Sequence, residues 1–243
     1  MDIGHAYTYI KDDPDWMKKL GIGAGLMLVG IFLFPVIFII YGYQVEVTRR
    51  VMNGEKNPLP DWDFGTMFME GLYLIIGRFV YGLPAILLIC IGFGAFWGLS
   101  IGGAASGSED LAAVLSGVGF LVYCIAFALF FLLMVMIAFV TPGLNIQFIR
   151  NNGELGSLFR FGEVIGIARD NIGNVLWIFL AALGANILIQ LVSALLSWTI
   201  CIPFILGLGG YVWIQIATGH LIGQMGSSFA APKGVWDEGL PGS

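Results

Sequence analysis

Charged side chains are scarce in this sequence. Asp, Glu, Lys and Arg make up 11% of its 243 residues, and hydrophobic residues make up 58%, against roughly 25% and 45–50% in soluble proteins. So few charges are too few to cover the surface of a soluble fold of this length. The net charge is −5, so the basic excess typical of nucleic-acid-binding proteins is also lacking. The composition predicts a membrane protein that binds no nucleic acid.

The residues and motifs of common reactive sites are also scarce. Cys90, Cys124 and Cys201 stand singly in apolar segments, which excludes the paired spacings of zinc and redox sites. No Gly-x-Ser-x-Gly, His-Glu-x-x-His or Walker pattern occurs. Surface carboxylates such as Asp61 and Asp63 are better explained as caps of the following helix. We therefore expect a non-catalytic protein with no metal and no cofactor.

The sequence contains four long stretches without any formal charge. They cover residues 20–45, 79–108, 111–149 and 171–232. A helix needs about 20 apolar residues to cross the hydrocarbon core, so the last stretch must fold back, and Trp198 and Pro203 suit a turn there. One membrane domain over residues 1–243 is predicted, with a polar N-terminus (1–19), a polar tail (223–243) and five spans: 20–43, 72–101, 112–140, 173–196 and 201–222.

These segments are apolar on every side, as in residues 85–93. Helices with this pattern lie in lipid or in a bundle core, whereas strands of a membrane barrel alternate apolar and polar residues. The predicted fold class is therefore all-α, a polytopic transmembrane helix bundle.

The distribution of Lys and Arg predicts the orientation, because these residues are enriched in cytoplasmic loops. With five spans, the side that holds the loops 44–71 and 141–172 and the C-terminal tail carries seven of them, and the N-terminal side carries three. We expect the protein to lie in the cell membrane, with the first of these sides facing the cytoplasm. Alternatively, 20–43 forms a re-entrant hairpin bent near Pro35, which would put the N-terminus on the cytoplasmic side too.

The two long loops resemble each other. Each contains, in order, Gln, Arg, Asn-Gly-Glu and Phe-Gly, starting at Gln44 in the first loop and Gln147 in the second. The order suggests a parallel span–loop–span repeat, as found in some transporters and in proteins that transport nothing; a chance match in Gly-rich loops is the alternative. Asn53-Gly54 and Asn152-Gly153 are expected to form tight turns.

Four short motifs carry a resemblance to a known family. They are Gly42-Tyr43, Arg49-Arg50-Val51, Gly54-Glu55 and Leu59-Pro60-Asp61-Trp62. Residues 41–72 thereby resemble the uncharacterised membrane family called domain of unknown function 4013, and the likeness extends over most of the chain in hydropathy. The resemblance implies a polytopic membrane protein and supplies no activity, ligand or catalytic residue.

Ionisable residues near the spans are the candidate binding residues, because such groups are costly in lipid. His220 could ligate a haem or pigment, and an interfacial hydrogen bond is the alternative. Arg78 is expected either to extend to the headgroups or to pair with Glu70 or a phospholipid phosphate. The residues expected to contact lipid or other anions are Arg49, Arg50, Arg78, Arg150 and Arg160.

Glycines recur every four residues in two spans, a pattern that lets helix backbones approach closely. The expected packing residues are Gly94, Gly98, Gly102, Gly219 and Gly223. Packing within the chain is the first interpretation, and self-association or docking to another membrane subunit is the second.

These features favour an accessory or scaffold subunit of a membrane assembly, surrounded by lipids and bound to other subunits or to itself. The alternatives are a transporter of small solutes or lipids, including a lipid-binding protein, and a haem- or pigment-binding subunit.

Overall fold

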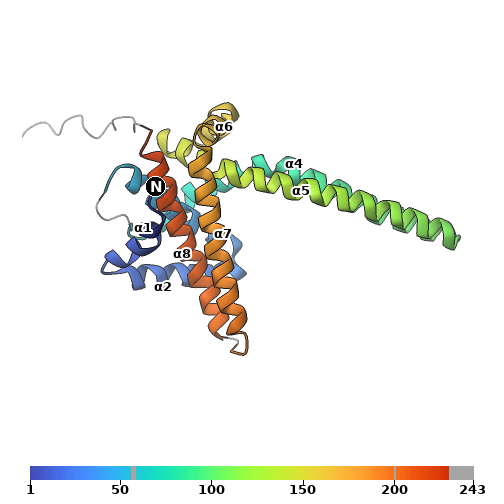
Figure 1. Cartoon of the computed structure of the whole chain (residues 1–243), viewed down its shortest axis with the longest axis horizontal. Coiled ribbons are helices and arrows are strands. Elements are labelled where there is room, and N and C mark those ends of the chain that lie inside the picture. Colours follow the sequence, from blue (N-terminus) through green and yellow to red (C-terminus); the bar gives the residue numbers. More distant parts are fainter. Residues whose placement is uncertain (56–58, 200, 230–243) are drawn as a thin grey trace, which may run out of the picture. The chain divides into compact units, whose positions relative to one another are not determined.

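The computed structural model describes residues 1–55, 59–199 and 201–229, and these are helical almost throughout, with no strand among them (Figure 1). The predicted all-α class is confirmed. Three short 3-10 helices are η1 (Tyr9–Asp12), η2 (Phe34–Val36) and η3 (Leu155–Phe159). The α-helices are α1 (Ile3–Thr8), α2 (Trp16–Phe32), α3 (Ile37–Met52), α4 (Phe64–Ala105), α5 (Glu109–Arg150), α6 (Phe161–Asp170), α7 (Ile172–Leu195) and α8 (Cys201–Gly226).

Four helices are long and apolar enough to cross a membrane: α4, α5, α7 and Ile202–Gly226 of α8. Only 6–28% of the residues in their apolar windows are buried, so these faces need lipid or a partner to cover them. The structure thus has four membrane-length helices and one shorter apolar hairpin, and the length and composition of the four helices indicate a membrane protein.

That hairpin corrects the prediction of one straight span over 20–43. The chain leaves α2 at Leu33 (φ −120°, ψ 78°), passes through η2 and begins α3 at Ile37. Pro35 has no N–H to continue the ladder of α2 and disfavours a helical residue before it. Gly30 lets Ile37 pack closely, because a β-carbon on Gly30 would lie 2.6 Å from Ile37 Cγ1. The bend near Pro35 is confirmed.

The chain forms two compact units. Unit 1 contains Met1–Gly77 and Phe139–Ser243, and unit 2 contains Arg78–Ala138. Unit 2 is a hairpin of the second part of α4 and the first part of α5, turning at Gly107 with φ +70°. Its helices approach closely at small residues, since a β-carbon on Gly103 would lie 2.8 Å from the Cα of Ala112.

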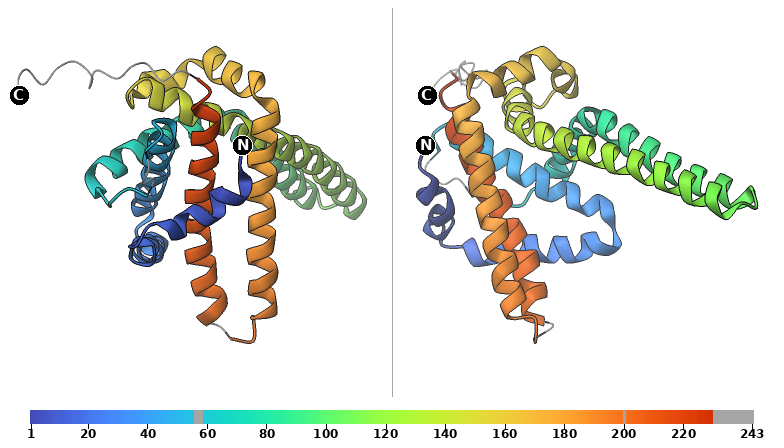
Figure 2. Two further views of the ribbon diagram at one scale, coloured as in Figure 1. Left: turned by 60° about the vertical axis from the view of Figure 1, so that its left-hand side comes forward. Right: turned by 45° about the vertical axis from the view of Figure 1, so that its right-hand side comes forward.

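In unit 1, α3 packs along α8, and α7 runs beside α8 in the opposite direction (Figure 2). The N-terminal segment packs on the same helix. The backbone N–H of Asp2 donates to Oε1 of Gln224 at 2.7 Å, and the Tyr9 hydroxyl donates to the carbonyl oxygen of Ile216 at 3.4 Å. The N-terminus therefore lies beside the C-terminal end of α8.

The two similar loops share a turn at a glycine of positive φ and lie between corresponding helices. Each follows the end of a helix, α3 or α5, and turns at a glycine of positive φ, Gly54 (+71°) or Gly153 (+77°). Each is followed by a helix that begins at the Phe of Phe-Gly, α4 at Phe64 and α6 at Phe161. Asn152 also has positive φ (+53°).

The helices on either side of each loop, α3 with α4 and α5 with α6, also cross at corresponding residues. A β-carbon on Gly42 of α3 would overlap the carbonyl of Met67, and one on Gly143 of α5 would lie 2.5 Å from the carbonyl oxygen of Val164. Met67 and Val164 are both the third residue after the Phe that begins the helix. The crossings support a duplication of this helix–loop–helix unit, and they pair Gly42 with Gly143.

Candidate functional site

Arg49 lies at the centre of an ion-pair cluster on α3 and α4. Its guanidinium donates to Glu46, one turn earlier on α3, and to Glu70 of α4. Nε of Arg50 donates to Glu46 at 3.1 Å and lies 3.7 Å from Glu55. Burial lowers the pKa of Arg49, but the carboxylates of Glu70 and Glu46 outweigh it and raise the pKa. Carboxylates of the same cluster thus neutralise Arg49 and Arg50, two of the five arginines that the sequence analysis assigned to lipids or other anions.

A small cavity of about 250 Å³ adjoins this cluster. Residues from α3, from the loop before α4 and from the start of α4 line it. They are Glu46, Arg50, Pro60, Asp61, Asp63, Thr66, Met67 and Glu70.

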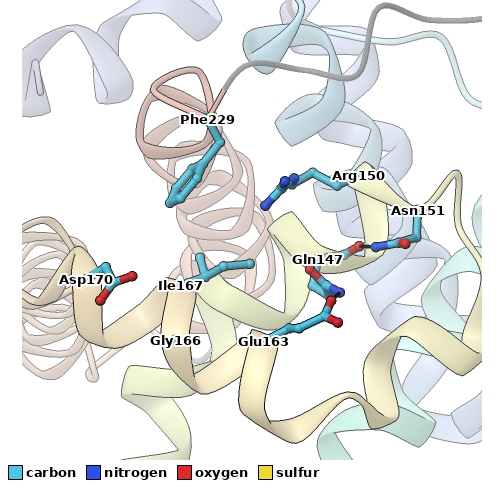
Figure 3. Close-up of a pocket in the computed structure, with 8 residues that line it drawn as sticks. All are labelled: Gln147, Arg150, Asn151, Glu163, Gly166, Ile167, Asp170 and Phe229. Carbon is cyan, nitrogen blue, oxygen red and sulfur yellow. Dashed lines mark hydrogen bonds between the residues drawn. The ribbon is translucent and has the colours of Figure 1, made fainter.

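A larger open cavity, of about 700 Å³, lies where α5 ends against α6 and the end of α8. Its lining residues are Gln147, Arg150, Asn151, Glu163, Gly166, Ile167, Asp170 and Phe229 (Figure 3). We call this space the Arg150 cavity.

Arg150 is half-buried in this cavity, with its guanidinium carbon 5.7 Å from the centre of the Phe229 ring. Gln147 donates from Nε2 to Oε2 of Glu163 at 2.5 Å, and Asn151 donates from Nδ2 to the carbonyl oxygen of Gln147 at 2.8 Å. Among the described residues, Arg150 forms no ion pair within 4.0 Å. Arg150 therefore presents a positive charge to the cavity.

The two other predicted arginines lie elsewhere. Arg160 is exposed and lies 3.7 Å from Glu163. Arg78 lies on α4, at the first residue of unit 2. The partner of Glu70 is Arg49, which the sequence could not predict because the two residues come from different helices.

His220 is 6% exposed and packs against the N-terminal segment. Its ring stacks on Tyr9 at 4.1 Å between ring centres, its Nδ1 lies 3.0 Å from Nε2 of Gln224, and the ring of His5 lies 5.5 Å away. Tyr9 thus covers one face of the imidazole. Within the described part of the chain, no group of three or more His, Cys, Asp or Glu side chains could hold a metal ion.

The predicted packing glycines divide into two groups. Gly219 and Gly223 lie against α3, where β-carbons would be 2.9 Å from the carbonyl oxygen of Gln44 and 2.5 Å from Cβ of Val51. At Gly94, Gly98 and Gly102, a β-carbon would meet nothing within 4 Å. Within unit 2, these three glycines therefore do not pack against the neighbouring helix α5.

The helical period explains this outcome. Gly92 and Gly103 are the α4 glycines that face α5. Gly94 comes two residues after Gly92, about 200° around the helix axis at 3.6 residues per turn. The ridge therefore lies on the side of α4 away from α5.

Comparison with known proteins places the chain in a family. The family model described as "Protein of unknown function (DUF4013)" matches residues 25–198. No curated protein and no solved structure matches the chain. The matched region includes residues 41–72, which carry the motifs noted above, and extends over well over half of the chain. The protein belongs to the DUF4013 family.

Proposed function

We propose that this protein is a non-catalytic subunit of a membrane assembly, and that the Gly94, Gly98 and Gly102 ridge of α4 binds a transmembrane helix of another membrane protein. The observation that carries the proposal is that, within unit 2, none of the three glycines packs against another helix. Glycines four residues apart let a second backbone approach closely, which favours helix association in lipid.

The surface around the ridge supports a helical occupant. Ile91, Trp97 and Ile101 are exposed to 67%, 50% and 63%. Apolar side chains beside a small-residue ridge give a partner helix both a groove and van der Waals contacts. No charged residue occurs between residues 79 and 108, so a helix can dock here without burying a charge.

The groove between α7 and α8 does not favour transport of a polar solute. It encloses about 500 Å³, and its lining includes Leu188, Ile189, Ile205 and Trp213. Such a surface suits acyl chains, whereas a solute pathway needs polar groups and water.

The same proposal includes an orientation in the cell membrane. The Asp2–Gln224 hydrogen bond joins the N-terminus to the end of α8, so both termini belong to one side when α2 and α3 form a re-entrant hairpin. The turns 106–108 and 196–199 on the other side carry no Lys or Arg. The positive-inside rule then assigns the termini and the loops 44–71 and 141–172 to the cytoplasm.

The test is purification of the natively expressed protein in mild detergent. We expect a stoichiometric membrane partner in wild type and its loss in Gly98→Val, whose added methyl groups fill the ridge. The matched control is Gly117→Val on α5, another glycine where a β-carbon meets nothing within 4 Å. Purification of the wild type as a lone monomer, or an equal loss of the partner in both variants, would overturn the proposal.

A further inference from the structure

When the two helix crossings are aligned at Gly42 and Gly143, Arg150 corresponds to Arg49. Each arginine is the seventh residue after the glycine at its crossing, Gly143 or Gly42. The two helices also share the pattern of burial through these positions, with both glycines buried and both arginines half-buried. The same counting pairs Glu46 with Gln147, the fourth residue after each glycine.

The partners of the two arginines differ. Arg49 donates to Glu46 and Glu70. The counterpart of Glu46 is the neutral Gln147. The counterpart of Glu70, the sixth residue after Phe64, is Ile167, the sixth after Phe161. Arg150 thus lacks both carboxylates that neutralise the equivalent arginine.

The cavities beside the two arginines are equivalent as well. Glu46, Arg50, Thr66 and Glu70 line the first, and their counterparts Gln147, Asn151, Glu163 and Ile167 line the second. The first encloses about 250 Å³ and the second about 700 Å³. The second copy of the helix–loop–helix repeat has therefore kept the guanidinium, lost the counterparts of Glu46 and Glu70, and enlarged the cavity.

We infer that the Arg150 cavity binds the headgroup of a phospholipid that carries both a phosphate and an ammonium group, such as phosphatidylethanolamine. Arg150 holds the phosphate in place of the missing carboxylates, because a guanidinium forms strong paired hydrogen bonds with phosphate oxygens. Asp170, with Glu163 on the same helix, faces the ammonium.

The charge of the cavity selects this headgroup. Arg150 contributes one positive charge, and Glu163 and Asp170 contribute two negative charges, of which Glu163 also lies 3.7 Å from Arg160 outside the lining. A purely anionic headgroup would meet repulsion from the two carboxylates, whereas a zwitterion complements both signs. Figure 3 shows Arg150 and Asp170 on opposite sides of Ile167 and Phe229, so the two ends of a headgroup have separate partners.

The position of α6 indicates that the headgroup belongs to a bilayer lipid. Phe161 and Ile165, four residues apart, are exposed to 47% and 48%, and Ile172 at the start of α7 is exposed to 56%. The cavity-lining residues Glu163, Ile167 and Asp170 share another face of α6. An amphipathic helix of this kind lies in the membrane interface, at the depth of the phosphates.

The test uses native mass spectrometry of the delipidated full-length protein in detergent. Phosphatidylethanolamine, phosphatidylglycerol and inorganic phosphate are added separately. We expect one phosphatidylethanolamine to be retained at least tenfold more strongly than phosphatidylglycerol, and inorganic phosphate to be retained weakly. Equal retention of the two lipids would overturn the assignment of the ammonium, and phosphate retained as strongly as lipid would overturn the assignment to a bilayer.

Three variants complete the test, each with its melting temperature measured to establish folding. Arg150→Gln should reduce retention of phosphatidylethanolamine at least tenfold. Asp170→Asn should reduce the preference for phosphatidylethanolamine over phosphatidylglycerol. Arg50→Gln, at the position equivalent to Asn151, should change neither. Unchanged retention in folded Arg150→Gln would overturn the inference.

Discussion

The hydroxyl of Thr48 on α3 donates a hydrogen bond of 3.0 Å to the carbonyl oxygen of Gly219 on α8, a residue 171 positions later in the chain. The same hydroxyl also lies 2.8 Å from the carbonyl oxygen of Gln44. Such a contact requires the backbones of α3 and α8 to lie close together. Gly219 and Gly223 permit this, because a side chain at either position would occupy the space of α3.

The first prediction concerns this packing. Gly223→Ala should destabilise the protein by about 1–3 kcal/mol, the usual cost of forcing extra volume into a packed interface, because the new methyl would lie 2.5 Å from Cβ of Val51. The measurement is thermal unfolding in detergent. The matched control is Gly207→Ala on the same helix, where a β-carbon meets nothing within 4 Å. Equal melting temperatures for the two variants would contradict the prediction.

The second prediction concerns the re-entrant hairpin. Single cysteines are placed at the exposed residues Asp15, Glu154 and Glu109 in a chain whose native cysteines are replaced by alanine. We expect Asp15→Cys and Glu154→Cys to react with a membrane-impermeant maleimide from the same side of the membrane, and Glu109→Cys from the other. Labelling of Asp15→Cys from the same side as Glu109→Cys would show that residues 20–43 cross the bilayer once.

The third prediction concerns pH. Burial raises the pKa of Tyr9 well above its ordinary value of 10.0, and the nearby Tyr43 raises it further. The unfolded chain therefore loses this proton at a lower pH than the folded chain. The stabilising contribution of neutral Tyr9 is fully present below pH 10 and declines as the pH rises toward the folded pKa.

Thermal unfolding measured at intervals from pH 8 to pH 11.5 tests this effect. Tyr9→Phe loses the hydrogen bond to Ile216 and should be less stable at pH 8, but its stability should fall less steeply above pH 10. Parallel curves for wild type and Tyr9→Phe would rule out the contribution of this phenol.

The fourth prediction concerns the paired turns. Gly54→Ala and Gly153→Ala should each cost about 1–2 kcal/mol of stability, because both glycines have positive φ, a conformation that disfavours a β-carbon. Gly162→Ala is the control, because it lies near the start of α6 and a β-carbon there meets nothing within 4 Å. The readout is the chemical or thermal unfolding midpoint in the same detergent, and a loss as large in the control would contradict the explanation.

Charge placement in the sequence was sufficient to predict the membrane-length helices, because each falls in a stretch that carries almost no formal charge. The bend after Phe32 was harder to predict. A proline at residue 35 is compatible with either a kinked helix or a turn, and the choice depends on Gly30 and Ile37 meeting after the reversal. The outward direction of Gly94 and its ridge likewise depends on which face of α4 meets α5.

The sequence also indicated the similar loops, but the helix crossings align them differently. It paired Gln44 with Gln147 because the letters match. The crossings pair Gly42 with Gly143 instead, because three residues separate Arg49 from its Asn-Gly turn and only one separates Arg150 from its turn. Only this alignment shows that Arg150 lacks the counterparts of Glu46 and Glu70.

The distance in sequence between α3 and α8 has a consequence for synthesis of the protein. About 170 residues must be added after Thr48 before Gly219 exists to accept its hydrogen bond. At roughly 5–20 residues per second, α3 waits on the order of ten to thirty seconds without the helix that covers it. During that interval the face of α3 that α8 covers stays open, and the Thr48 hydroxyl keeps its hydrogen bond to the carbonyl oxygen of Gln44 within α3.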